Sequence, residues 1–462
     1  MIESLRNIWN MKDLRTRILF TLSILAVYRV GAFIPTPGIN TEVLRQIFDR
    51  SRGTVLGFLD LFSGGNFGNF TIFALGITPY ITASIILQLL TVVWPYLERL
   101  SKEGELGRKK ITQYTRYLTV CLSLIQSVGI ASFLQSMPAE GGAQVVTNPG
   151  FGFVFMTMLT QTCGTAFIMW LGERISERGV GNGMSLIIFA GIVSGLPSAT
   201  RGIFSRLIQQ QWSPLFVIIL LAIMVVVVGF IVLVERAQRR IPVQYAKRVV
   251  GRRVMGGQAT HLPLKVNVGG VIPVIFASSV LTFPQTFGLM FQESRFFNSL
   301  TDALRFGEPL YNLLFVTFII FFCYFYTSIV FNPTEVADNM RKYGGFIPGI
   351  RPGRTTAAHV ETILTRITFA GAIYLALIAV IPEFMITGFH IHHLPWVGSY
   401  FESLPNWILN GMGVQFYFGG TSLLIVVGVA MDTVQQIEAQ LIMRNYDGFL
   451  GPRGRRIRGR RS

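Results

Sequence analysis

The chain has few charged residues and very few cysteines for its length. Only 14% of its 462 residues are charged and 51% are apolar, and the mean hydropathy of +0.51 is far above that of a soluble protein. This composition excludes an ordinary soluble domain and indicates a polytopic membrane protein. The three cysteines, Cys121, Cys163 and Cys323, all fall inside apolar segments, so we expect neither a disulfide framework nor a CxxC metal site.

The sequence also lacks the motifs of a nucleotide-driven or ion-driven machine. No G-x-x-x-x-G-K-[ST] occurs, and the glycine-rich stretch Gly179–Gly183 precedes an apolar segment instead of following a strand. Acidic residues lie in loops and at segment ends, never in the middle of an apolar segment, where a proton or sodium relay would need them. We therefore expect no cofactor, no metal, no catalytic residues and no ATP hydrolysis by the chain itself.

Ten apolar segments predict ten membrane spans. Lys and Arg favour the cytoplasmic side, and the alternate connections carry 32 of them on one side of the membrane and 7 on the other. This asymmetry places both termini in the cytoplasm. The spans are approximately 18 to 35, 71 to 97, 114 to 136, 151 to 171, 184 to 200, 214 to 234, 268 to 291, 310 to 331, 363 to 387 and 410 to 431.

A short apolar piece, about Val55 to Phe70, precedes the second span and does not fit this pattern. It is rich in Phe, is broken by several glycines, and is too short to cross a bilayer core of ~30 Å. Such a piece is typical of a re-entrant segment. Because irregular backbone at membrane depth is tolerated only inside protein or beside water, a re-entrant segment here implies a cavity.

Ten spans with both ends inside divide into two oppositely oriented sets of five, and the sequence contains matches between the sets. Gly76–Ser84 in span two and Gly270–Ser278 in span seven both read G-[IV]-x-P-x-I-x-A-S. Gly183–Ile188 in span five and Gly420–Ile425 in span ten both read G-x-S-L-x-I. Gly and Pro interruptions at matching places in inverted halves point to a transport path near the midplane, lined by these four spans.

Each match carries an isoleucine at the same place: Ile81 with Ile275, and Ile188 with Ile425. An apolar ring of this kind closes a wet pore by dewetting. The alternative is that the four residues only pack helices together. The predicted division is an N-terminal half over 1–200, a hinge connection over 201–213, a C-terminal half over 214–432 and a basic tail over 433–462.

Basic residues outside the core suggest an anionic partner. The loop over 235–267 contains eight Lys or Arg and one acid, and the loop after span eight adds Arg341, Lys342, Arg351 and Arg354. The first loop is long for a connection, which suggests an ordered projection suited to ribosomal RNA or to an acidic patch on a soluble motor. Arg29 is the one basic residue well inside a span and not near its cytoplasmic end, and we expect it to reach toward the outer interface.

These residues resemble the SecY family over nearly the whole chain. The resemblance rests on GAFIPTPGI, FSGG, FALGITPYITASIILQLL, KKITQYTRY, WLGERISERGVGNGMSLIIFAGIVSGLP, ERAQRRIPVQYAKR, THLPLKVNVGGVIPVIFASS, FNPTEVADN, FIPGIRPG and FYFGGTSLLIVVGVAMD. It implies an all-α protein-conducting channel of ten transmembrane helices, in two inverted five-helix halves around an hourglass pore. It also implies the inner (plasma) membrane of a bacterium, SecE and SecG subunits, the SecA ATPase or a ribosome, membrane lipid, and unfolded or nascent chains with a signal sequence as substrate.

Carried over by position, the resemblance assigns roles to individual residues. The lateral gate lies between spans two and three on one side and seven and eight on the other, and the plug is the segment before span two. Met184 stands where an isoleucine is usual, and its flexible thioether should seal comparably. The implied residues are Ile77, Ile81, Met184, Ile188, Ile275 and Ile425 in the pore ring; Phe58, Leu59, Leu61, Phe62, Ser63, Gly64 and Gly65 in the plug; Gln88, Ser278 and Ser279 at the lateral gate; and Arg252, Arg253 and Arg351 in contact with the motor or ribosome.

Two other classes of membrane protein are compatible with the sequence. An inverted-repeat carrier of small solutes would share the topology, although the absence of acids in mid-span disfavours it. A membrane enzyme would need a catalytic constellation that the sequence does not contain.

Overall fold

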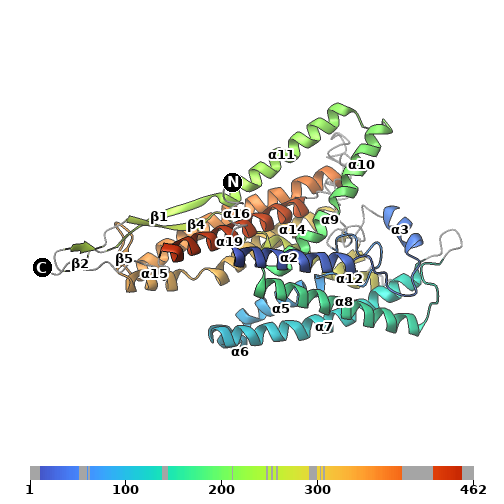
Figure 1. Cartoon of the computed structure of the whole chain (residues 1–462), viewed down its shortest axis with the longest axis horizontal. Helices are drawn as coiled ribbons and strands as arrows, with labels where there is room; N and C mark the ends of the chain where they lie inside the picture. Colours follow the sequence, from blue (N-terminus) through green and yellow to red (C-terminus); the bar gives the residue numbers. More distant parts are fainter. Residues whose placement is uncertain are drawn as a thin grey trace.

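The protein consists of two helical bundles and a β-projection at one end (Figure 1). The computed structural model describes residues 11–50, 60, 63–137, 144–210, 212–245, 248–250, 253–255, 259–290, 299–301, 303–304, 307–387 and 420–449.

The first bundle packs helices from the N-terminal half. Helix α7 is its centre, because it contacts both α5 and α8, and α8 in turn contacts α2 and α9. A short amphipathic helix, α3, covers one end of this bundle with Leu44 and Phe48 buried. The elements are α2 (Lys12–Gly31), α3 (Thr41–Arg50), α5 (Thr78–Val93), α6 (Pro95–Lys102), α7 (Glu105–Ser136), α8 (Phe151–Arg178) and α9 (Gly183–Ser194).

The second bundle packs as a chain of neighbours, in which α12 contacts α14, α14 contacts α16, α16 contacts α19 and α19 contacts α11. Helix α11 has the most apolar membrane-length segment among the described helices and is the least buried of them. The elements are α11 (Pro214–Arg236), α12 (Ile272–Met290), α14 (Pro309–Val330), α15 (Pro333–Lys342), α16 (Arg354–Thr387) and α19 (Gly420–Phe449).

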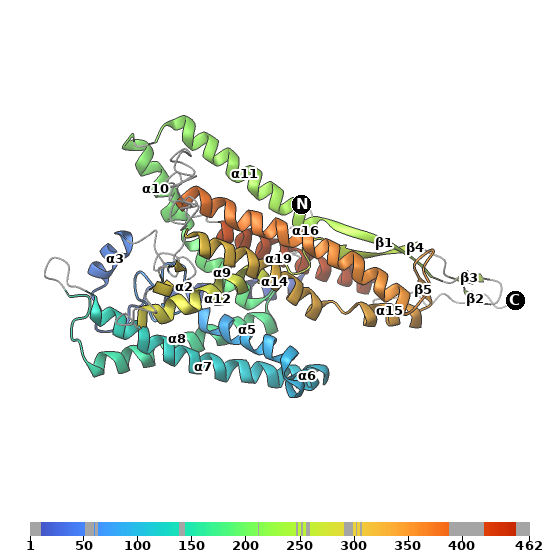
Figure 2. The ribbon, with the colours of Figure 1, turned by 180° about the vertical axis from the view of Figure 1, so that it is seen from behind.

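In the described chain, the two bundles pack against each other mainly at two places. Helix α12 of the second bundle packs against α5 and α7 of the first, and α19 packs against α9. Helix α10 (Leu196–Ile208) joins the bundles at the end opposite the projection, as both views show (Figures 1 and 2). The predicted connection over 201–213 is therefore mostly helix instead of loop.

The predicted projection is ordered at its base. Strand β1 (Gln238–Tyr245) pairs antiparallel with β4 (Ala259–Lys265) on one edge and with β5 (Gly345–Phe346) on the other. Ile241 and Val243 alternate with exposed residues along β1 and are buried against Met340 and Val360. Two further strands, β2 (Arg248–Val250) and β3 (Arg253–Met255), form a second hairpin between β1 and β4 in the chain.

The helical membrane fold is confirmed, and each of the ten predicted spans contains a helix among the described residues. Within the described parts of the chain, six helical segments are long and apolar enough to cross a membrane: Glu105–Ser136, Phe151–Arg178, Pro214–Arg236, Pro309–Lys342, Arg354–Ile381 and Thr421–Leu441. Helices α5 and α6 make a seventh if they count as one, although they meet at an angle of 99°. Pro95 explains the bend, since the residue before a proline is disfavoured in helical geometry.

The helices of the other three predicted spans are shorter or carry more charge. Helix α2 carries charges at both ends, including Lys12 and Arg29. Helix α9 has only 12 residues. Helix α12 has 19 residues, is apolar on average and contains Pro284. The second span was predicted over 71–97, but its helix starts only at Thr78, after a series of turns.

Gln161 explains how these turns are tolerated at membrane depth. This residue of α8 is buried and reaches across to the irregular backbone before α5. Its Nε2 donates to the Thr71 carbonyl and to the Thr36 hydroxyl, both at 2.9 Å, and its Oε1 accepts from the amide of Leu75 at 3.4 Å. Backbone groups that a helix would have paired are thus satisfied within the protein.

Candidate functional site

The second membrane helix of each bundle begins in the same way. Gly76 has φ 58° and Gly270 has φ 57°, and α5 and α12 each begin two residues later. The amides of Ile81 and Ile275 then make equivalent first-turn bonds to the carbonyl four residues earlier, at 3.1 and 3.2 Å. A positive φ is a conformation that glycine adopts without strain, so the matched glycines set matched helix starts.

The second sequence match also coincides with helix starts. Gly183 is the first residue of α9, and Gly420 is the first residue of α19. The Asn182 side chain caps α9 by accepting from the amide of Met184 at 3.1 Å. Three of the helices singled out by the repeat, α5, α9 and α12, thus begin at a matched glycine or two residues after it, and Gly420 is the first described residue of the fourth.

The structure brings the six candidate pore residues into one apolar cluster formed by both bundles. Five of them are buried members of this cluster, and Met184, which is half-buried, packs against it. Three come from α9 or α19, which contact each other, and three lie at or beside the starts of α5 and α12, which also contact each other. The buried five are Ile77, Ile81, Ile188, Ile275 and Ile425.

Only part of the candidate plug lies in the described chain. Phe58, Leu59, Leu61 and Phe62 lie outside the described residues. Ser63 is buried. Its hydroxyl donates to the Asp60 carbonyl at 3.0 Å, and the same hydroxyl oxygen accepts from the amide of Phe67 at 3.0 Å. Gly64 and Gly65 follow with φ 72° and 83°.

Arg29 lies beside this segment. It occupies the last turn of α2, where a cation also interacts favourably with the helix dipole. Its Nη1 is 3.5 Å from the Gly64 carbonyl, and its guanidinium lies 5.2 Å from the centre of the Phe33 ring. That Arg29 reaches toward the outer interface stays a prediction, and its contact with the Gly64 carbonyl was not indicated by the sequence.

The candidate gate residues lie near one of the two seams between the bundles. Ser278 and Ser279 are buried on α12, the helix that meets α5 and α7. The Ser278 hydroxyl donates to the Ile275 carbonyl at 2.9 Å. Gln88 on α5 is half-buried, and its amide donates to the Ser84 hydroxyl at 3.1 Å. Small and hydroxyl side chains at such a seam let helices approach closely.

The candidate partner-binding arginines lie on the projection and beside it. Arg253 is the first residue of β3, whereas Arg252 lies outside the described residues. Arg351 is exposed in the loop between β5 and α16, and its carbonyl accepts from the hydroxyls of Thr355 and Thr356. Because β5 pairs with β1, this loop joins the base of the projection.

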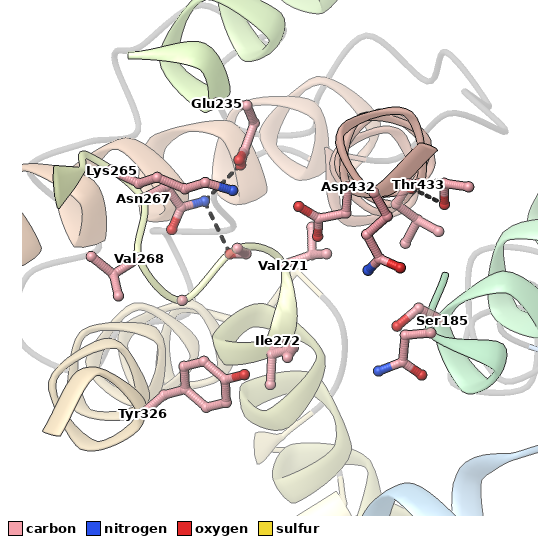
Figure 3. A pocket seen from close by; sticks show the side chains of 15 residues that line it. Ser185, Glu235, Lys265, Asn267, Val268, Val271, Ile272, Tyr326, Asp432 and Thr433 are labelled. Carbon is pink, nitrogen blue, oxygen red and sulfur yellow. Dashed lines mark hydrogen bonds between the residues drawn. The ribbon is translucent and has the colours of Figure 1, made fainter. Parts of the chain in front are cut away.

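A polar pocket of about 190 Å³ lies where the base of the projection meets the helices (Figure 3). Asn267, in the link between β4 and α12, donates to Glu235 Oε1 at 2.6 Å and to the Gly270 carbonyl at 3.0 Å. Lys265 Nζ donates to Gln435 Oε1 of α19 at 2.7 Å. The projection is therefore bonded to the end of α11, to the turn that starts α12, and to α19.

Two of these features were missed in the sequence. Gln161 is a polar residue within an apolar span, which is a recognisable signal, but its partners are up to 125 residues away in the chain. Asn267 lies in the basic loop over 235–267, where no role for its side-chain amide was predicted from the sequence. Long-range pairing of this kind cannot be deduced from local pattern.

Comparison with known proteins decides the family. The SecY family model matches residues 71–434. The protein translocase subunit SecY of Escherichia coli strain K12 is 48% identical over 441 residues, which cover 95% of this chain and 94% of that protein. The chain belongs to the SecY family.

Solved structures agree with this family at the level of the fold. A SecY structure described by how its plug domain stabilises the closed translocation channel and maintains a membrane seal aligns with TM-score 0.64 at 16% identity, over 93% of each chain. Sec61 from a canine ribosome–channel complex of the endoplasmic reticulum aligns with TM-score 0.59 at 15% identity, also over 93% of each chain. This SecY chain is thus a multi-pass membrane protein with the channel fold.

Proposed function

We propose that the six clustered apolar residues form the constriction of a protein-conducting channel, the function that membership of the SecY family gives this chain. As a SecY protein it is a component of a translocase and not an enzyme, which removes the small-solute carrier and the membrane enzyme from consideration. The observation that carries the proposal is the pair of matched helix starts at Gly76 and Gly270, which supports a symmetric pore wall between the two halves.

In this proposal the ring closes the resting pore by dewetting. A narrow passage lined only by Ile and Met side chains offers water no hydrogen-bond partners, so ions meet a barrier without any charged filter. When an extended polypeptide enters, the flexible side chains close around it and limit leakage. The segment from about 55 to 70 acts as the plug that fills the passage when no chain is present.

Apolar segments leave sideways between α5 and α7 on one side and α12 and α14 on the other. Release into lipid is favourable for a sufficiently apolar segment, because Leu, Ile, Phe and Val at a helix centre each contribute about −0.3 to −0.6 kcal/mol. The seam of α12 against α5 and α7 supports this exit, with Gln88, Ser278 and Ser279 near it. The halves separate about the connection over 201–213.

The partners follow from the charged surface and from the family. We infer binding of SecE and SecG in the membrane, and of SecA or a ribosome at the basic projection and the Arg351 loop. The energy for transport comes from SecA, from the ribosome or from the proton motive force. The chain lies in the inner membrane of a bacterium with both termini cytoplasmic, as the distribution of Lys and Arg predicts.

Crosslinking of a stalled secretory chain tests this function. A photoreactive side chain at position 81 should crosslink to a preprotein that is held in mid-transit by a folded C-terminal domain. The matched control is the same side chain at Val226 on α11, which is 69% exposed and is not a member of the cluster that holds the candidate ring. Strong crosslinks at 81 with none at 226 are expected, whereas equal crosslinks at both positions would contradict the assigned path.

A further inference from the structure

The polar pocket of Figure 3 lies about one turn before the candidate ring on two helices. Ser185 of α9 lines the pocket three residues before Ile188, and Ile272 of α12 lines it three residues before Ile275. Residues at this spacing share a face of a helix and are separated by about 4.5 Å along its axis. Both helices begin on the side of the membrane that the distribution of Lys and Arg makes cytoplasmic. The pocket is therefore on the cytoplasmic side of the ring.

Helix α19 runs in the opposite direction and places a carboxylate in the same pocket. Asp432 follows Ile425 by seven residues, so the two side chains share a face and lie about 10 Å apart along the axis. The carboxylate points across to the turn that starts α12, where a Cβ on Gly270 would be 3.8 Å from its Oδ2 (Figure 3). In the proposed channel, a polypeptide that approaches the ring from the cytoplasm passes this carboxylate.

The pocket has a net negative charge, although the predicted cytoplasmic face carries most of the Lys and Arg of the chain. Its lining contains two carboxylates, Glu235 and Asp432, and one ammonium, that of Lys265. Asn267 donates to Glu235, and Lys265 donates to Gln435. Within the described residues, Asp432 has neither a hydrogen bond nor an ion pair, and it is exposed. Asp432 is thus the charged group that is available to a ligand.

This chemistry fits an ammonium or guanidinium group. A volume of about 190 Å³ holds several waters, so a basic head group can enter and keep part of its hydration. A metal ion fits less well, because no group of three or more His, Cys, Asp or Glu that could hold one lies among the described residues. Further oxygen acceptors around Asp432 come from the side chains of Asn182, Ser185, Tyr326, Thr433 and Gln436.

We propose that this pocket is a subsite for a basic side chain of the translocated polypeptide, and that Asp432 binds that side chain. The inference rests on the proposed function, because it needs a polypeptide that enters from the cytoplasm. Signal sequences have a basic start followed by an apolar stretch, so the substrate class supplies the ligand. Asp432 then determines orientation, because it favours substrates whose basic start stays cytoplasmic.

The distance between the pocket and the ring suits such a substrate. An extended residue spans about 3.3 Å, so a chain whose basic residue is held at Asp432 reaches the level of Ile425 about three residues later. The apolar stretch that follows the basic start is then at the ring, beside the seam of α12 against α5 and α7. A chain that enters with its basic flank leading through the ring loses the interaction with Asp432.

The orientation of a reporter in inverted membrane vesicles that contain the full translocase tests the subsite. The reporter has one apolar segment preceded by a pair of lysines, and protease digestion from the cytoplasmic side measures how often this flank stays cytoplasmic. Asp432→Asn should lower the ratio of cytoplasmic to translocated flanks about two- to fivefold, as expected for the loss of one partly solvated ion pair. Asp432→Glu keeps the charge and should stay within about twofold of the unaltered chain.

Three controls separate the subsite from general damage. Glu438→Gln removes a negative charge from an exposed position of α19 that does not line the pocket, and it should leave the ratio unchanged. A reporter with glutamines in place of the lysines should be oriented alike by Asp432→Asn and by the unaltered chain. Charge reversal should give a gain of function, because Asp432→Lys should keep a glutamate flank cytoplasmic more often than the unaltered chain does.

A disulfide measures the proximity of the basic flank to the pocket. Ser185→Cys, in a background with Cys121, Cys163 and Cys323 replaced, should form a disulfide with a cysteine beside the lysines of a stalled reporter when copper phenanthroline is the oxidant. Ser101→Cys on α6 is the matched control, because Ser101 is exposed and does not line the pocket. It should form little or no disulfide.

The outcomes separate the subsite from the channel. An unchanged ratio in Asp432→Asn, or an equal change for the lysine and glutamine reporters, would overturn the subsite. Equal disulfide formation by Ser185→Cys and Ser101→Cys would overturn it as well. The crosslink at Ile81 tests the channel independently, so a stalled chain that crosslinks there supports the channel even when the subsite is overturned. If no such crosslink forms, the proposed path fails and the subsite fails with it.

Discussion

Gly76 and Gly270 lie 194 positions apart in the chain and have φ angles of 58° and 57°, each two residues before a helix of the candidate pore. Both conformations are left-handed, where a Cβ is disfavoured. The space around them is open enough for a methyl group, with the nearest atoms 3.7 Å away at Gly76 and 3.8 Å away at Gly270. Their glycine identity thus reflects backbone conformation more than packing.

Substitution of either glycine by alanine should therefore cost similar stability. We expect Gly76→Ala and Gly270→Ala each to lower the free energy of unfolding by ~1–2 kcal/mol, the cost of a left-handed non-glycine residue. Gly229→Ala in α11, where a Cβ meets nothing, should be neutral or slightly stabilising. Thermal unfolding in detergent measures the three variants, and a loss at Gly229 as large as at the other two would contradict the backbone argument.

Substitution of Gln161 should destabilise the turns that precede α5. Gln161→Leu leaves the Thr71 carbonyl, the Thr36 hydroxyl and the Leu75 amide without this partner in a buried place. Unpaired buried groups cost about 1–3 kcal/mol each, so we expect a total loss of ~2–5 kcal/mol after relaxation.

Gln113→Leu on α7 is the control for Gln161, because Gln113 is exposed and its amide donates to the hydroxyl of Tyr117 one turn away on the same helix. Thermal unfolding of the two variants should differ clearly. Equal stability of Gln161→Leu and Gln113→Leu would show that the turns before α5 do not depend on the glutamine.

Charge reversal at the projection should weaken partner binding and leave the fold intact. The triple variant Arg252→Glu, Arg253→Glu, Arg351→Glu removes three positive charges and adds three negative ones. Attraction to an anionic surface therefore falls, and the binding affinity depends less steeply on salt concentration. We expect at least tenfold weaker binding of SecA or ribosomes in vesicle flotation at low salt.

Arg201→Glu on α10 is the control for a charge reversal elsewhere on the protein, because α10 lies at the end opposite the projection (Figure 1). It should bind partners like the unaltered chain. Normal SecA-driven transport by the triple variant would refute the assignment of these arginines.

The sequence allowed more of the membrane core to be predicted than of its connections. The glycines of the repeat motifs lie at or just before the starts of α5, α9 and α12, because Gly and Pro dictate backbone geometry locally, although the second span had been predicted to begin at 71. Burial of Ile81 and Ile275 followed from the same pattern, although their place in a ring stays a prediction.

The differences lie where long-range contacts decide the local structure. The turns over 71–77 were predicted as helix because their apolar composition resembles the rest of the span, whereas Gln161 of α8 pairs their backbone instead. Pro197 stands in the first turn of α10, where proline is compatible with a helix, so most of the predicted hinge connection over 201–213 continues that helix. The Arg29 contact with Gly64 requires two segments 35 residues apart to meet, which no local pattern encodes.

The resting conductance of ring variants in planar bilayers tests the central claim most directly. Ile81→Ser with Ile275→Ser places two hydroxyls in the constriction, where they give water hydrogen-bond partners and lower the barrier to ions. Ile218→Ser with Ile223→Ser, on the exposed α11, is the matched control. A clear rise in conductance for the first pair alone is the predicted result, and unchanged conductance in a correctly folded Ile81→Ser, Ile275→Ser channel would contradict the account.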